Sequence, residues 1–466
     1  MLATARPSLL LVTLTALAAC GSRSDLAVGS DPEGQGGATS TTGTDTATTA
    51  TTATTSGTTT TSATVLPTGT CDVLVIDGQP LSPTPMFDGF EQTLPWLVAT
   101  EKDRSRAALA VAELGNLGAD LAPQAASVAF DDPWGVWPDS LGKSAVHTSN
   151  LGFVAGDGEE GRISLLTTDE PNGLGQPTGM VVWFPTAGVA GAQGQYYDQQ
   201  DAGYPLFVTA NQAEWLAAFQ QTFGGPVQHL SLARIDSPIT SGSFAGSIAC
   251  ATDAALSGAA LPWGDGFLLA LSNGRPFNTC FDDPVADGPP SRVQIAVVQE
   301  DLTRFFLTAE YDEIKTYIFQ VRAAPSKTGA WIAWERIPFE PPTGRRLALL
   351  QLDEDGFPVT GLVFEVPTGT IGTPISLASL GDLPALATTR EDAAGGRLLD
   401  VQVFTEEGAP FGAITLSAEP GWEMDASVSL LAAPTGDRLL VAWSEAASQS
   451  GAGRVRVARL ACVGGL

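Results

Sequence analysis

A short apolar strand built around an alanine occurs seven times along this chain, each time followed by a turn and a second apolar strand. The alanines are Ala99, Ala155, Ala217, Ala270, Ala333, Ala387 and Ala442. The gaps between them are 56, 62, 53, 63, 54 and 55 residues. The second strand usually opens with a basic residue, as in Arg346-LALLQLD and Arg454-VRVARL. A nearly fixed period indicates that one supersecondary unit is repeated along the chain.

Each repeat contains two β-rich runs around a polar turn, which is typical of an antiparallel hairpin. Further apolar runs, such as residues 181–184 and 361–366, lie between the repeats and supply two more strands to each unit. Four-stranded sheets repeated about an axis form a β-propeller, whereas a linear solenoid usually has shorter repeats and capping units. The sequence therefore predicts an all-β, seven-bladed β-propeller over residues 71–466. A sandwich or irregular all-β domain whose hairpins only look periodic is the alternative.

The alanine of each repeat is interpreted as the small residue of an inner strand, because blades converge near the axis of a propeller. Tryptophans in the same strands are expected to pack between blades rather than to form a sugar-stacking platform; they are Trp96, Trp215, Trp331, Trp334 and Trp443. A second internal match lies 52 residues apart, in Leu352-DEDG-Phe357-Pro358 and Phe404-TEEG-Ala409-Pro410. It predicts a turn at the end of the partner strand, with its glycine at positive φ.

The two ends of the propeller region indicate how the ring closes. The last repeat ends after RVRVARLACVGGL without a fourth strand, whereas CDVLVID (71–77) precedes the first repeat and belongs to none. We expect this N-terminal strand to complete the last blade. Cys71 and Cys462 then lie on neighbouring strands, and Cys250 and Cys280 fall in one repeat. We predict disulfides Cys71–Cys462 and Cys250–Cys280, with free buried thiols as the alternative.

Residues 1–19 have the pattern of an export signal, with Arg6 followed by an apolar run too short to span a bilayer. The run ends in Leu-Ala-Ala-Cys20, which resembles the lipobox of bacterial lipoproteins. The resemblance implies cleavage before Cys20, acylation of Cys20 and anchoring in the bacterial cell envelope. Gly21 in the next position favours the outer membrane or cell surface. An ordinary signal peptide with a chance cysteine is the alternative. Together with the repeats, the chain resembles the poorly characterised propeller lipoproteins of bacteria.

Composition limits the kinds of partner and attachment that are possible for this chain. Residues 20–70, with the lipidated cysteine at their start, are rich in Thr, Ser, Gly and Ala, and a segment of this kind is expected to be a disordered tether. The net charge is −28, from 51 acidic and 23 basic residues. This excludes the basic footprint that nucleic-acid binding needs, and it leaves the lipid as the membrane attachment. We expect a monomer that binds an envelope protein or a glycan.

The sequence contains few residue patterns that indicate a particular chemical reaction. It has two histidines, no nucleophile elbow and no phosphate-binding glycine loop. No cofactor is expected. Calcium is the one ion that the acidic turns could bind, with Asp353 and Asp355 as weak candidates, although such turns are usually only solvated. The inner strands of the repeats are predicted to carry few polar residues, namely Thr100, Glu335, Thr388 and Arg390, which favours binding over catalysis.

The sequence therefore favours an envelope-anchored binding or scaffolding module over an enzyme. The candidate binding loop spans residues 186–203 and contains Tyr196, Tyr197, Asp198 and Asp201, a mixture of aromatic and acidic side chains that suits recognition. Ordinary loop decoration would look the same. The alternative function is a carboxylate-based glycan hydrolase or lyase working in the propeller channel, and a purely structural envelope protein is a third possibility.

Overall fold

The computed structural model describes thirty β-strands between Thr70 and Val463, and no helix occurs among the residues it describes. Those residues are 70–73, 75–76, 79–80, 84–90, 93–99, 106–113, 124–129, 148–157, 162–169, 178–184, 193–196, 204–211, 214–222, 227–236, 242–252, 256–274, 289–299, 302, 304–312, 315–338, 345–359, 364–366, 372–393, 395–433, 436, 438–447 and 453–463. Side chains are described from Leu206 onward. Within these ranges there is accordingly no helix that could cross a membrane.

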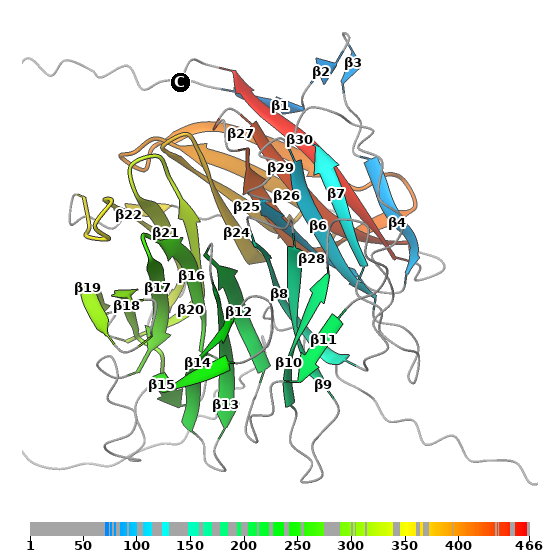
Figure 1. Ribbon diagram of the computed structural model, residues 1–466. Coiled ribbons are helices and arrows are strands. Elements are labelled where there is room, and N and C mark those ends of the chain that lie inside the picture. The colour runs from blue at the N-terminus through cyan, green and yellow to red at the C-terminus, as the bar shows by residue number, and fades with distance from the viewer. Residues whose placement is uncertain are drawn as a thin grey trace, which may run out of the picture.

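The strands form successive antiparallel sheets, which we number 1 to 7 in chain order (Figure 1). Sheet 1 contains β5 (Thr93–Ala99), β6 (Arg106–Glu113) and β7 (Gln124–Ala129). Sheet 2 contains β8 (Thr148–Asp157), β9 (Arg162–Asp169), β10 (Thr178–Phe184) and β11 (Gln193–Tyr196). Sheet 3 contains β12 (Tyr204–Ala210), β13 (Glu214–Thr222), β14 (Val227–Asp236) and β15 (Gly242–Thr252). Each sheet is thus a meander of strands adjacent in sequence.

The second half of the chain continues the pattern. Sheet 4 contains β16 (Gly258–Trp263), β17 (Gly266–Asn273), β18 (Arg292–Val298) and β19 (Phe305–Asp312). Sheet 5 contains β20 (Thr316–Pro325), β21 (Ala330–Pro338), β22 (Arg346–Leu352) and β23 (Phe364–Val366). Sheet 6 contains β24 (Gly372–Leu380), β25 (Leu383–Glu391), β26 (Arg397–Phe404) and β27 (Pro410–Ser417). The predicted all-β class with antiparallel hairpins is confirmed.

Sheet 7 combines the two ends of the described chain. It contains β28 (Trp422–Ala432), β29 (Arg438–Ala447) and β30 (Gly453–Val463), and β30 also pairs with β1 (Thr70–Val73) and β4 (Thr84–Phe90). Thr70–Val73 pair with the end of β30, where Cys71 is the cross-strand partner of Cys462, while β4 pairs with the start of β30. The segment 71–77 is not one strand, because β2 (Val75–Ile76) turns away to pair with β3 (Gln79–Pro80). Figure 1 shows β1 lying along β30.

The first strand of each sheet contacts the first strand of the next. The contacts run from β5 to β8, β12, β16, β20, β24 and β28, and β28 in turn contacts β5. A similar hydrogen bond recurs between several of these strands. Ser257, Gln320 and Ser376 accept backbone N–H bonds from Val321, Ile375 and Leu430, at 2.8, 2.7 and 2.9 Å. A polar side chain just before or on the first strand of one sheet therefore accepts a hydrogen bond from a backbone N–H of the next sheet. A backbone N–H that is buried away from water needs such a hydrogen-bond partner.

The structure corrects the placement of the repeat alanines. In sheets 3 to 7 they lie on the second strand of the sheet and not on the innermost one, as at Ala217, Ala333 and Ala442. Ala99 and Ala155 lie on the first strands β5 and β8. The second strand is covered on both faces by neighbouring sheets, so a small residue there serves close sheet packing. For this reason the sequence did not predict that polar residues such as Gln320 lie on the first strands.

The core lies between neighbouring sheets, and strand β21 shows how it is built. Ile332 and Trp334 pack with sheet 4, whereas Trp331 and Ala333 on the other face pack with sheet 6. A strand buried on both faces reads as a continuous apolar run, which explains the sequence AWIAW. Trp331, Trp334 and Trp443 are fully buried, so the predicted packing role is confirmed for these three.

The two matched turns have the predicted geometry. Asp353 donates its backbone N–H to Phe357 O at 2.8 Å, and Thr405 donates to Ala409 O at 2.7 Å. The glycines Gly356 and Gly408 adopt φ values of 85° and 79°. The internal repeat therefore correctly located both the turns and the positions that need glycine.

Gly329, in the turn between β20 and β21, is a position where glycine is required for two reasons. Its φ is +155°, and a Cβ added there would lie 2.0 Å from the carbonyl oxygen of Leu352. We expect Gly329→Ala to lower the free energy of unfolding by roughly 1–3 kcal/mol, measured by urea unfolding. Gly421→Ala is the control, because Gly421 has φ +87° with no atom within 4 Å of the added Cβ. Equal losses in both variants would contradict a steric contribution at Gly329.

Candidate functional site

Polar side chains gather at the edge where the second strand of a sheet ends and the third begins. In sheets 4 to 7 this edge carries Asn273, Glu335, Arg390 and Glu445 near the ends of the second strands. The basic residues that open the third strands of sheets 4 and 7, Arg292 and Arg454, lie opposite this edge and form ion pairs there. Arg292, for example, pairs with Glu310 and Asp312 of the fourth strand at 3.6 and 3.3 Å. The candidate site is this series of charge clusters.

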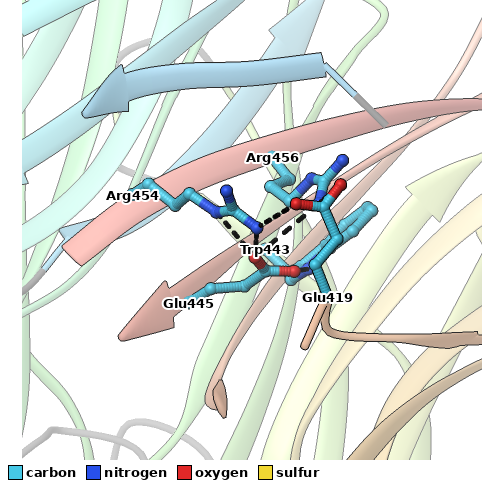
Figure 2. A network of polar contacts seen from close by, with 5 residues as sticks. All are labelled: Glu419, Trp443, Glu445, Arg454 and Arg456. Carbon is cyan, nitrogen blue, oxygen red and sulfur yellow. Dashed lines mark hydrogen bonds and ion pairs between the residues drawn. The ribbon is translucent and has the colours of Figure 1, made fainter. Parts of the chain in front are cut away.

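The most buried cluster lies in sheet 7 (Figure 2). Glu445 is 1 % exposed, and its Oε1 accepts the indole N–H of Trp443 at 2.8 Å. Its Oε2 lies 2.6 Å from the Nη2 of Arg454 and 3.9 Å from the Nη1 of Arg456. Hydrogen bonds to both carboxylate oxygens hold the charge of Glu445 in place without solvent.

Glu419, in the connection from sheet 6 to sheet 7, completes this cluster from the solvent side. Its carboxylate lies 2.7 Å from Arg456 and 3.0 Å from Arg454. Hydrogen bonds from Arg456 and then Arg454 hold the pKa of Glu419 below its ordinary value. The guanidinium of Arg454 also lies 3.8 Å from the ring centre of Trp422, a cation–π contact. Two carboxylates thus balance two guanidinium groups.

Sheets 5 and 6 hold smaller versions of the same arrangement. Glu335 is buried and lies 3.2 Å from Arg345. In sheet 6, Arg390 Nε lies 2.5 Å from Asp400 Oδ2, and Thr415 donates its hydroxyl to Asp400 Oδ1. Each buried carboxylate among the described residues, namely Glu335, Asp400 and Glu445, is therefore paired with an arginine.

Glu335 offers a pH-dependent prediction. Burial raises the pKa of Glu335, and this effect outweighs the lowering by Arg345 and Arg322. A carboxyl whose pKa is higher in the folded protein than in the unfolded protein binds its proton more tightly in the folded state. Its contribution to stability therefore falls as the pH rises from the pKa of the unfolded state through the pKa of the folded state. Relative to the wild type, Glu335→Gln should therefore gain stability over that window and keep a constant advantage above it. Thermal unfolding from pH 4 to pH 8 measures this; a pH-independent difference would contradict it.

The acidic turn proposed for calcium is used by its own backbone. Asp353 Oδ1 accepts the N–H groups of Asp355 and Phe357 at 3.0 and 2.8 Å. Within the described part of the chain, no group of three or more His, Cys, Asp or Glu could hold a metal ion. Calcium at Asp353 and Asp355 stays a prediction.

The other predicted site residues are only partly described. Tyr196 is the last residue of the edge strand β11, opposite Met180. Tyr197, Asp198, Asp201, Cys20 and Cys280 lie outside the described residues. The charge clusters were not predicted from the sequence. For the cluster of sheet 7, the signal was the basic residue that opens the third strand, together with a carboxylate near the end of the second.

Comparisons with known proteins give structural similarity at very low identity. No family model matches the chain, and no curated protein matches it. An α-L-arabinofuranosidase, Arb93A from Fusarium graminearum, is 9 % identical with a TM-score of 0.45, covering 68 % of this chain and 94 % of that one. The β-propeller domain of the Trilobed protease from Pyrococcus furiosus is 6 % identical with a TM-score of 0.42, covering 78 % and 93 %.

A third similar structure is a hypothetical selenium-binding protein from Sulfolobus tokodaii. It is 12 % identical with a TM-score of 0.46, and the match covers 82 % of this chain and 95 % of that one. Glycoside hydrolases recur among the similar structures, but these values are too low to carry a conclusion about the activity of this chain.

Proposed function

We propose that this chain is a binding or scaffolding module for an envelope protein or a glycan, built as a seven-bladed β-propeller. One observation carries the choice of binding over catalysis: each buried carboxylate among the described residues lies within ion-pair distance of an arginine. A glycosidase needs two carboxyl groups facing the scissile bond, one of which gives up and takes back a proton. Carboxylates locked to guanidinium groups serve packing instead.

The proposed ring has specific support. The succession of first-strand contacts returns from β28 to β5, and both β1 and β4 pair with β30. A closed ring removes exposed inner edges and shields the buried polar clusters. Small-angle X-ray scattering of the secreted domain should give the flat, disc-like particle of a closed propeller; an elongated particle would favour an open arrangement.

We also propose the disulfides Cys71–Cys462 and Cys250–Cys280. Supporting the first, Cys71 and Cys462 are cross-strand partners, at the separation of about 4.5–5.5 Å between Cα atoms that a disulfide requires. Mass spectrometry of a non-reduced tryptic digest tests both pairs, and a Cys71–Cys280 peptide would overturn the assignment.

The membrane attachment is proposed to be the lipid on Cys20, with residues 20–70 as the tether of the propeller on the bacterial surface. The support is the sequence pattern that ends in Cys20. Cys20→Ala should move the protein from the membrane fraction to the soluble fraction. Globomycin treatment, which blocks lipoprotein signal cleavage, should leave a longer precursor of the wild type.

Binding is tested on the intact lipidated protein in its own membranes, by crosslinking and mass spectrometry, followed by glycan arrays with the purified chain. The segment with Tyr196, Tyr197, Asp198 and Asp201 is the first proposed contact, so deletion of residues 197–203, which keeps strand β11, should abolish capture. The hydrolase alternative requires Glu335, the buried carboxyl with the raised pKa, to reach substrate. Turnover of chromogenic glycosides that Glu335→Gln abolishes would establish that alternative.

A further inference from the structure

The exposed large apolar side chains of the described residues lie on two elements, the outer strand of sheet 4 and the turn that follows β22 in sheet 5. They are Phe306, Leu307, Phe357 and Val359, which are 53, 46, 52 and 50 % exposed, and no others of this kind occur in the described part. We call these four residues the apolar edge. Figure 1 shows β19 at the outside of the molecule, beside the turn that follows β22.

The turn that carries Phe357 and Val359 lies against sheet 4. Phe306 on β19 is the cross-strand partner of Val297 on β18. A Cβ added at Gly356 would lie 3.0 Å from Cγ2 of Val297 and 3.8 Å from Cγ2 of Thr308. The turn that carries Phe357 therefore rests on the face of sheet 4 that carries Phe306.

The fold itself does not require these side chains. The matching turn of sheet 6 has the same hydrogen bonds, but it carries Ala409 where sheet 5 carries Phe357. The matching outer strand β27 places Pro410, Ala413, Thr415 and Ser417 at its exposed positions. Isolated apolar residues on a surface are ordinary, but a group confined to one of several equivalent positions is typical of an interaction site.

The backbone of β19 offers hydrogen-bonding groups at the edge of sheet 4. Among the described strands, β19 is the last of its sheet and pairs with β18 alone, so its outward N–H and C=O groups can pair with an added strand. Glu354 and Asp355 are exposed in the adjoining turn, whereas the exposed Glu310 and Asp312 at one end of β19 already pair with Arg292. Carboxylates around an apolar strip favour a partner that carries Lys or Arg.

We propose that the apolar edge binds an extended segment of a partner protein, which adds a strand to β19. Apolar side chains of the partner pack on Phe306 and Phe357, and its Lys or Arg side chains face the carboxylates of Glu354 and Asp355. This inference rests on the proposed binding function and names the partner as a basic, apolar β-strand.

The test uses a synthetic peptide of alternating Val and Lys as the probe, with fluorescence polarisation on the full chain. Its Kd should rise by about tenfold in the Phe306→Ser, Phe357→Ala double variant, as expected for loss of aromatic anchors. Ala413→Ser on β27 is the matched control and should bind as the wild type does. A Val and Glu peptide should not bind. Equal affinity of all variants would show adsorption to an acidic protein and overturn the proposal.

Hydrogen exchange of β19 amides distinguishes strand addition from other contacts, because the peptide should slow their exchange while those of β27 stay unchanged. Sedimentation checks a second copy of this chain as occupant: self-association that the double variant abolishes, without peptide binding, overturns the proposal. If the intact protein captures a partner equally well with the double variant, the binding function stands and this site is wrong. Loss of capture together with loss of peptide binding supports both.

Discussion

Trp443→Ala is expected to lower the free energy of unfolding by about 3–5 kcal/mol, the usual cost of deleting a large buried aromatic side chain. Trp443 is fully buried on β29, in the cluster that joins sheets 6 and 7 through Val401, Val403 and Leu460. The substitution leaves a cavity between two sheets that cannot move together, since each also contacts its other neighbour. It also removes the N–H donor of Glu445. Urea unfolding followed by tryptophan fluorescence and circular dichroism measures the loss.

Two controls separate the contributions of Trp443. Trp443→Phe keeps most of the packing but not the indole N–H, so it should lose less than half as much stability as Trp443→Ala. Phe357→Ala removes an aromatic ring that is about half exposed and should change stability little. Comparable losses at Trp443 and Phe357 would contradict the assignment of the core to the space between sheets.

Glu445→Ala is expected to destabilise the protein by about 3–5 kcal/mol, because it leaves a buried guanidinium without its partner. Arg454 and Arg456 are 7 % and 3 % exposed, and the substitution removes the buried one of the two carboxylates described around them, leaving the exposed Glu419. The loss comes from the uncompensated charge and not from the carboxylate itself. Thermal and urea unfolding report it.

Partial rescue distinguishes this explanation from simple loss of packing. The double variant Glu445→Ala, Arg454→Met removes a charge of each sign and should recover part of the stability that Glu445→Ala loses. Glu419→Gln acts on the exposed carboxylate and should cost less than Glu445→Ala. Additive losses in the double variant would mean that the ion pair is not the source of the effect.

Much of the strand pattern could be predicted from the sequence, because apolar alternation and turn residues are local properties. The turns at 353–356 and 405–408 and the antiparallel hairpins follow from such local signals. The position of a strand within its sheet is not local. Ala333 and its equivalents were placed one strand too far inward because a buried second strand and an inner strand read alike.

The candidate site was predicted least well. The arginine at the start of a third strand is visible in the sequence, but its partner depends on register, as Glu445 and Arg454 show by facing each other across β29 and β30. Phe306 and Phe357 are ordinary apolar residues in the sequence, separated by most of one repeat. Only their common position on the surface of sheet 4 distinguishes them from core residues.

The sequence by itself determined that this protein is all β-strand, built from a repeated antiparallel unit, because the period of the apolar residues and the turn residues between them follow from the backbone alone. The tertiary structure decided which strand of each unit is innermost, that β1 and β4 both pair with β30, and which carboxylate meets which guanidinium. These features depend on contacts between residues far apart in the chain. Burial and the cost of unpaired charge arise only when those residues are brought together.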